Sequence, residues 1–238
     1  MAVKSCGELP SGEFFKIKNK MGRARTGVIK TAHGEILTPG FAFVATHGTI
    51  KSLDKKEHSL ASPELTISNT FHLFVTDKVR EIKKSGGLHK RFGLKNPIMT
   101  DSGGFQIFSL GWGKVHKIGK VASPSTSDIG LGKNPACPVS SGVKIGNNGV
   151  VFTYDGRKYK LDPGISIKIQ EDLGADIIFA FDECTSPLHS YDYNKKSLEK
   201  THRWAKKCLK AKKKNGQALF GVVQGGVYKD LREESSAV

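Results

Sequence analysis

The stretch IMTDSGGFQIFSL, residues 98–110, places a short apolar run directly against Asp101, Ser102 and two glycines. Three other stretches have the same form, an apolar run that ends in polar residues or glycine: ELTISNT (64–70), ADIIFAFDEC (175–184) and ALFGVVQGG (218–226). Uniformly apolar runs of this length are typical of parallel strands that are covered on both faces. The repeated pattern therefore predicts a parallel α/β fold.

Helical segments between these runs support that prediction. In LDPGISIKIQEDLG, Asp162 can cap the first N–H groups, Pro163 suits the first helical position and Gly174 can end the helix. A closed (β/α)8 barrel needs eight strands. Five are found, at 41–46, 65–70, 97–100, 176–181 and 219–223. The sequence thus predicts either an open sheet or a TIM barrel of which about five strands are present.

The chain divides into a short tail and a long α/β region, and two segments of that region differ from its strand–helix pattern. Residues 1–13 are interpreted as an N-terminal tail, and residues 14–238 as the α/β region. Residues 14–46 alternate apolar and polar types between glycines, which predicts antiparallel β-hairpins that lead into the first parallel strand. Residues 118–150 are rich in Gly, Ser, Pro and Asn and have no sustained period, so we interpret them as a loop-like insertion.

Composition points to a cytoplasmic protein with an anionic partner. No run of eighteen apolar residues and no signal-peptide core is found, which predicts no membrane association. The four cysteines form no CxxC pair, so they match neither a zinc site nor a disulfide framework. The formal net charge of +16 favours nucleic-acid binding. A generally lysine-rich surface is the alternative, and it also accounts for the lysines of the helix expected at 194–216.

The polar ends of the strands form a candidate site, because chemistry in parallel α/β proteins gathers beyond the carboxyl ends of strands. The residues at these ends are Asn69, Thr70, His72, Asp101, Ser102, Asp182, Glu183, Cys184, Gln224, Gly225 and Gly226. Paired carboxylates can carry out a displacement at a sugar carbon, and amides and hydroxyls can bind the edge of a planar heterocycle. Taken singly, each residue has an ordinary interpretation: a helix cap, a packed cysteine, a structural histidine or a tight turn.

Four segments resemble the signatures of a known family. MTDSGGFQIFSL, SNTFHLFV, GADIIFAFDECT and LFGVVQGGVYKDLREES are similar to segments of the tRNA-guanine transglycosylases, also called queuine tRNA-ribosyltransferases, of the bacterial type. The similarity runs from about residue 14 to the last residue, apart from 118–150. It implies a (β/α)8 barrel that exchanges guanine at the anticodon wobble position of tRNA for a 7-deazaguanine, preQ1, through a covalent ribosyl–enzyme intermediate in queuosine biosynthesis.

The resemblance assigns roles to individual residues. It implies proton transfer for Asp101, hydrogen bonds to the purine edge for Ser102, Asp182 and Gln224, with Gly225 beside them, and stacking on the base for Phe105. Cys184, in FDEC, resembles the bacterial form that takes preQ1. The wobble nucleotide would have to be turned out of its stack to reach these residues.

Other features of the family have no match here. The nucleophilic aspartate and the cysteine–histidine zinc ligands belong to later segments, so we expect a C-terminally incomplete chain that is inactive alone, with zinc only in the complete fold. The implied partners are tRNA with a wobble guanine, the guanine or preQ1 base, and a second copy in a homodimer. The alternatives are an archaeosine-type transglycosylase and a non-catalytic tRNA-binding subunit.

Overall fold

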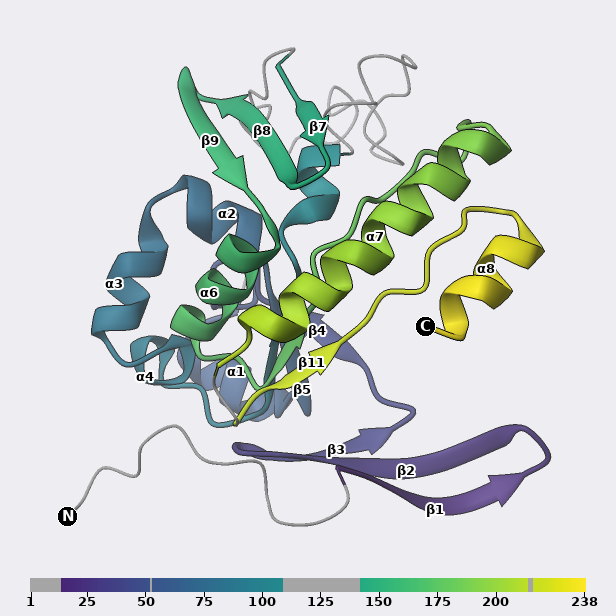
Figure 1. Cartoon of the computed structure of the whole chain (residues 1–238). Helices are drawn as coiled ribbons and strands as arrows, with labels where there is room; N and C mark the ends of the chain where they lie inside the picture. Colours follow the sequence, from purple (N-terminus) through teal and green to yellow (C-terminus); the bar gives the residue numbers. More distant parts are fainter. Residues whose placement is uncertain (1–13, 52, 109–141, 214–215) are drawn as a thin grey trace, which may run out of the picture.

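A computed structural model describes residues 14–51, 53–108, 142–213 and 216–238 (Figure 1). The predicted tail at 1–13 and most of the predicted insertion, residues 118–141, lie outside the described residues. In the described part, no helix is both long and apolar enough to span a membrane.

Five parallel strands form the central sheet, in the order β11-β10-β6-β5-β4. They are β4 Ala42–Val44, β5 Leu65–Ser68, β6 Ile98–Thr100, β10 Ile177–Phe179 and β11 Ala218–Phe220. All five predicted strands are therefore confirmed. Among the described residues β4 and β11 are the two edges of an open sheet, so a closed barrel is not shown.

Helices cover one face of this sheet (Figure 1). They are α1 Lys55–Ala61, α2 Thr70–Val75, α3 Lys78–Lys84, α4 Leu88–Phe92, α6 Pro163–Leu173, α7 Tyr191–Ala211 and α8 Lys229–Ser236, with a further helical turn at 104–108. The predicted ends of α6 are confirmed: the Asp162 carboxylate accepts a hydrogen bond from the Ile165 N–H at 2.9 Å, and Gly174 ends the helix with φ 72°. The main core lies between these helices and the sheet and includes Phe71, Ile98, Phe108, Ile167, Phe181 and Trp204.

A second, antiparallel sheet packs against α7. Its strands are β7 Lys144–Gly146, β8 Gly149–Tyr154 and β9 Arg157–Leu161. Residues 144–150, the end of the predicted loop-like insertion, are not an irregular loop: they form β7, a turn at Asn147 and Asn148, and the start of β8. The indole N–H of Trp204 on α7 donates to the Asn147 carbonyl at 2.8 Å, which joins this sheet to the core.

The predicted N-terminal hairpins are confirmed as a three-stranded antiparallel sheet. Its strands are β1 Phe15–Met21, β2 Ala24–Thr31 and β3 Gly34–Thr38. The turn between β2 and β3 lies at the amino ends of the parallel strands, since His33 contacts Asp176 just before β10. In Figure 1 this sheet lies below the parallel one. It thus occupies the end of the parallel sheet opposite the predicted site.

Candidate active site

Asp182 is the centre of a polar cluster at the carboxyl ends of the parallel strands. Its carboxylate accepts hydrogen bonds from the Ser102 hydroxyl at 3.2 Å and from the Gln224 amide at 2.5 Å. These three residues follow β6, β10 and β11, which are neighbours in the sheet. The structure therefore brings together the three residues that were predicted to bind a purine edge, on a carboxylate whose residue is only 8% exposed.

Asp101 is held by a second set of donors. Its carboxylate accepts hydrogen bonds from the Asn69 amide at 2.5 Å, the Thr70 backbone N–H at 2.7 Å and the Gln106 amide at 3.5 Å. Asn69 also accepts a hydrogen bond from the His72 backbone N–H at 3.0 Å, which caps α2. The start of α2 therefore fixes the orientation of the Asp101 carboxylate.

Burial makes both carboxylates costly to ionise. Desolvation raises the pKa of Asp101 and the pKa of Asp182 above the usual range, and the hydrogen bonds to each carboxylate oppose this only in part. All the donors around them are neutral amides, hydroxyls or backbone N–H groups. A raised pKa in a polar cluster is typical of groups that exchange protons or bind polar ligands.

Two glycines bring the chain segments of the site together. A Cβ on Gly104 would lie 3.0 Å from the Asp182 carbonyl oxygen, so a side chain there would push the turn after β6 away from β10. Gly225 has φ 121°, and its Cβ would lie 2.8 Å from the Arg232 nitrogen of α8. Both glycines therefore have a packing role in this part of the chain.

The remaining predicted residues differ in accessibility. The Phe105 side chain is 51% exposed at the start of the 104–108 turn, where its ring can be reached from solvent. Cys184 is half-buried, and burial raises the pKa of its thiol to about 11, so it is a neutral thiol at pH 7. Glu183 points away from the cluster, since its carboxylate meets Tyr193 at 2.8 Å and Lys200 at 2.7 Å on α7.

Sequence reasoning missed two residues that support the site. The Gln106 side chain reaches Asp101, and the Ser166 hydroxyl of α6 donates to the Ser102 carbonyl at 2.7 Å. Gln106 could have been found, because it is a polar residue within the same DSGGFQ segment. Ser166 belongs to a helix more than sixty residues further along the chain, and no local pattern links it to the site.

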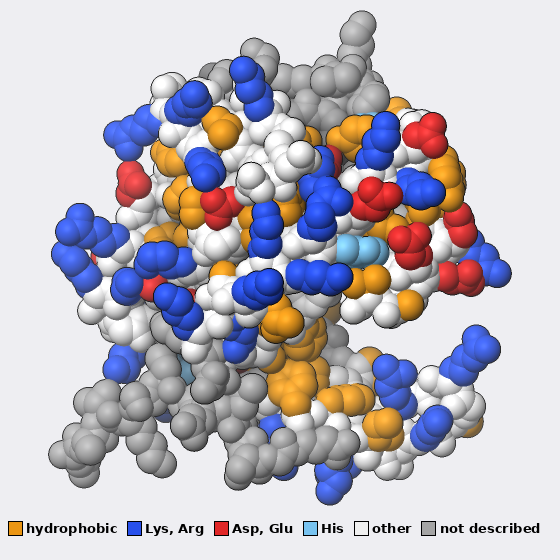
Figure 2. Space-filling view, viewed as in Figure 1, with side chains coloured by type: hydrophobic (Ala, Val, Ile, Leu, Met, Phe, Trp, Pro, Cys, Tyr) orange, Lys and Arg blue, Asp and Glu red, His pale blue; other side chains and the backbone are white. Residues whose placement is uncertain are grey.

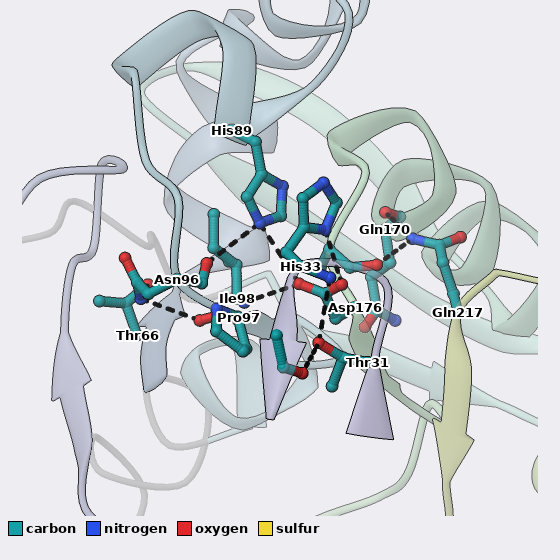
Figure 3. A network of polar contacts seen from close by, with 12 residues as sticks. Thr31, His33, Thr66, His89, Asn96, Pro97, Ile98, Gln170, Asp176 and Gln217 are labelled. Carbon is teal, nitrogen blue, oxygen red and sulfur yellow. Dashed lines mark hydrogen bonds and ion pairs between the residues drawn. The ribbon is translucent and has the colours of Figure 1, made fainter. Parts of the chain in front are cut away.

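A histidine–aspartate cluster lies at the opposite end of the sheet (Figure 3). Asp176 accepts hydrogen bonds from His33 Nδ1 at 2.7 Å and from the Ile98 backbone N–H at 2.9 Å, and His89 Nε2 lies 3.3 Å from its other side. Burial alone would raise the pKa of Asp176, but these hydrogen bonds outweigh it and lower the pKa to about 2.

The three possible metal-donor atoms of this cluster, on His33, His89 and Asp176, lie within 4.8 Å of one another. The two imidazole rings are stacked, with centroids 3.5 Å apart and planes 12° apart. An imidazole binds a metal ion close to its own ring plane, so one ion cannot be in plane with both rings. The donor set therefore does not fit the zinc that the resemblance implies, and we interpret it as a hydrogen-bonded brace between the N-terminal sheet and β10.

Comparison with known proteins gives a consistent result. A family model described as Queuine tRNA-ribosyltransferase matches residues 20–131 and 111–238. A provisionally named queuine tRNA-ribosyltransferase of Archaeoglobus fulgidus is 45% identical over 227 residues, which cover 93% of this chain and 56% of that protein. The queuine tRNA-ribosyltransferases of Fusobacterium nucleatum and Herpetosiphon aurantiacus are 42% and 40% identical, over 93% and 94% of this chain and 52% and 50% of theirs. The chain thus spans about half the length of the curated relatives it matches.

Proposed function

The chain belongs to the queuine tRNA-ribosyltransferase family, and on that premise we propose that it supplies the base-binding part of a tRNA-guanine transglycosylase. The reaction replaces the wobble guanine of a tRNA anticodon with a 7-deazaguanine. We further propose that the parallel sheet is part of a (β/α)8 barrel, and that the protein works in the cytoplasm on tRNA as a homodimer.

The cluster around Asp182 is the observation that carries this proposal. Guanine presents the N1–H and N2–H donors side by side, next to the O6 acceptor. A carboxylate can accept from both donors, while an amide such as that of Gln224 donates to O6. The Gln224 amide nitrogen lies 2.5 Å from an oxygen of the Asp182 carboxylate, and Ser102 offers a hydroxyl to the same carboxylate. Phe105, half exposed beside them, would stack on the base.

Asp101 is proposed to move the proton of the exchange. The leaving guanine needs a proton on its ring nitrogen when the bond to ribose breaks, and the incoming base must lose one when the bond is remade. A carboxyl group whose pKa is raised by burial keeps a proton to a higher pH than an exposed one, which suits a group that gives up a proton and takes it back. The amide of Asn69 and the backbone of Thr70 keep it in one orientation.

The remaining steps belong to groups outside this cluster. We propose that a carboxylate from another segment attacks the ribose anomeric carbon and forms a covalent ribosyl–enzyme intermediate, as the resemblance implies. Zinc has no fitting ligand set among the described residues, and no step depends on it. PreQ1 is the proposed incoming base because Cys184 stands in the bacterial-type segment FDEC.

Exchange of labelled guanine into a tRNA with a wobble guanine tests the proposal. The 238-residue chain, its Asp101→Asn variant and its Asp182→Asn variant would be assayed together with guanine binding by calorimetry. We expect Asp101→Asn to retain guanine binding and Asp182→Asn to lose it. Retention of binding by both variants would contradict the assignment. Binding of tRNA without exchange by the wild-type chain would favour the tRNA-binding subunit, and competition between preQ1 and the archaeosine precursor base would separate the two enzyme types.

A further inference from the structure

The β1–β2 hairpin carries a concentration of positive charge. Six cations lie on it and no Asp or Glu occurs from residue 14 to residue 34: Lys16, Lys18, Lys20, Arg23, Arg25 and Lys30. The first five are exposed. In the view of Figure 2, the hairpin at the lower right shows Lys and Arg side chains and no acidic ones. All the charged side chains of the hairpin are therefore positive.

The register of the hairpin places like charges side by side. Lys20 pairs directly with Arg25 across the two strands. Like charges at directly opposed positions destabilise an antiparallel pair. Among the described residues, none of the six cations forms an ion pair with a carboxylate within 4.0 Å. A bound polyanion would remove this repulsion.

The hairpin lies far from the base-binding cluster. Its sheet is braced to the amino ends of the parallel strands through His33 and Asp176, whereas Asp182 lies beyond the carboxyl end of β10. The six residues from Asp176 to Asp182 correspond to roughly 20 Å of extended chain. The base site and the sheet that carries the hairpin thus lie at opposite ends of the parallel strands, so an anion bound by the hairpin would be another part of a long ligand or a different ligand.

We propose that the β1–β2 hairpin binds the phosphate backbone of the tRNA outside its anticodon loop. The inference rests on the proposed function for the identity of the RNA. Alternate positions along a regular strand are about 7 Å apart, and although a register shift between Ile17 and Asn19 interrupts this spacing at Lys18, the hairpin presents its cations at distances of the same order as successive phosphates in a nucleic acid strand. Phosphate contacts of this kind position the RNA without reading its sequence. The His33–Asp176 contact holds the turn between β2 and β3, and with it this sheet, against the amino end of β10.

The test measures binding of fluorescent tRNA to the 238-residue chain across a salt series. The variant Lys16→Thr, Lys20→Thr, Arg25→Thr removes three exposed charges with residues that favour strands. A matched control, Lys84→Gln, Lys90→Gln, Lys158→Gln, removes three exposed charges elsewhere. We expect the hairpin variant to lose about tenfold or more in tRNA affinity and its log–log salt slope to shrink by about 2 to 3. Its affinity for an isolated anticodon stem–loop should stay within about twofold of wild type.

Three results would overturn the inference: unchanged tRNA affinity in the hairpin variant, an equal loss in the control, or hairpin-dependent binding to anionic lipid vesicles without binding to tRNA. Circular dichroism and thermal melting of both variants establish that they are folded. The hairpin variant could lose tRNA affinity while the wild-type chain binds tRNAs with wobble guanine and wobble adenine equally well. That result would support the hairpin inference and contradict the proposed function. The two proposals can therefore fail separately.

Discussion

The two ends of the parallel sheet hold buried aspartates in opposite electrostatic situations. At the carboxyl ends, Asp101 and Asp182 are surrounded by neutral donors, and burial raises the pKa of each. At the amino ends, Asp176 is also buried, but the hydrogen bonds from two imidazoles and a backbone N–H lower its pKa to about 2. The same residue type thus stabilises the fold at one end and remains available for chemistry at the other.

The largest effect is expected for Asp176→Ala. The substitution leaves His33, the Ile98 N–H and His89 without their shared acceptor at a buried position. We expect the free energy of unfolding to fall by about 3–5 kcal/mol, because two to three donors lose a charged acceptor and each such hydrogen bond contributes about 1.5–3 kcal/mol. Urea denaturation of the variant and of Asp182→Asn provides the measurement. A loss below about 1 kcal/mol for Asp176→Ala would remove the distinction between the two ends.

Asp182→Asn should instead affect binding. Hydrogen bonds to a charged acceptor contribute about 1.5–3 kcal/mol each, and guanine would make two to this carboxylate. We expect guanine affinity to fall about a hundredfold, measured by calorimetry, while the free energy of unfolding stays within about 1 kcal/mol of wild type. The control Asp172→Asn makes the same substitution on the outer side of α6, where Lys83 and Lys168 pair with the carboxylate. Equal losses in both variants would contradict the assignment.

The pH dependence of stability should also separate the two ends. The folded-state pKa of Asp176, about 2, lies below its ordinary value of 3.8, so its ionisation stabilises the fold above pH 4. This stabilisation, about 2 kcal/mol, disappears as pH falls from 4 to 2. Asp101 and Asp182 act in the opposite direction, because their raised pKa values make protonation favour the folded state. Between pH 2 and 4, the urea midpoint should therefore fall less with decreasing pH for Asp176→Asn than for wild type; parallel curves would contradict the lowered pKa.

The smallest effect is expected for an aspartate that belongs to neither end. Asp162 caps α6 through the Ile165 N–H and meets Lys160 at 3.2 Å. Replacing a helix cap with alanine costs about 1 kcal/mol, so Asp162→Ala should lower the urea midpoint slightly and leave guanine binding unchanged. A change in guanine binding as large as that of Asp182→Asn would show that α6, not Asp182 itself, determines affinity.

Local sequence patterns were sufficient for the parallel strands, the N-terminal hairpins and α6, because hydrophobic periodicity and capping residues act over short distances. The expectation that polar residues gather beyond the carboxyl ends of parallel strands also placed Ser102, Asp182 and Gln224 together, as the structure has them. Their roles in base binding remain predictions. The antiparallel sheet of 144–161 was missed, although its turns carry hairpin signals: Asn147–Asn148 followed by Gly149, and Asp155–Gly156 with φ of 48° and 72°.

Contacts between distant segments could not be predicted in this way. His33 and Asp176 are 143 residues apart. Nothing in either neighbourhood indicates that one side chain will accept a hydrogen bond from the other. The same holds for Ser166, whose hydroxyl supports the turn after β6 from a helix that comes later in the chain. Such contacts depend on how the strands and helices pack against one another. A local pattern indicates only which face of its own strand or helix a side chain occupies.

The packing of Trp204 gives the protein an internal optical reporter. Its fully buried indole stacks on Phe181 with centroids 5.0 Å apart, and Phe181 immediately precedes Asp182. The same indole N–H is bound to the Asn147 carbonyl of the antiparallel sheet. The sequence has one other tryptophan, Trp112, so a Trp112→Phe variant would emit from Trp204 alone. The fluorescence of Trp204 would then report solvent exposure of the indole whenever the antiparallel sheet separates from α7. Because the indole stacks on Phe181, it would do so next to Asp182, the carboxylate proposed to bind the base.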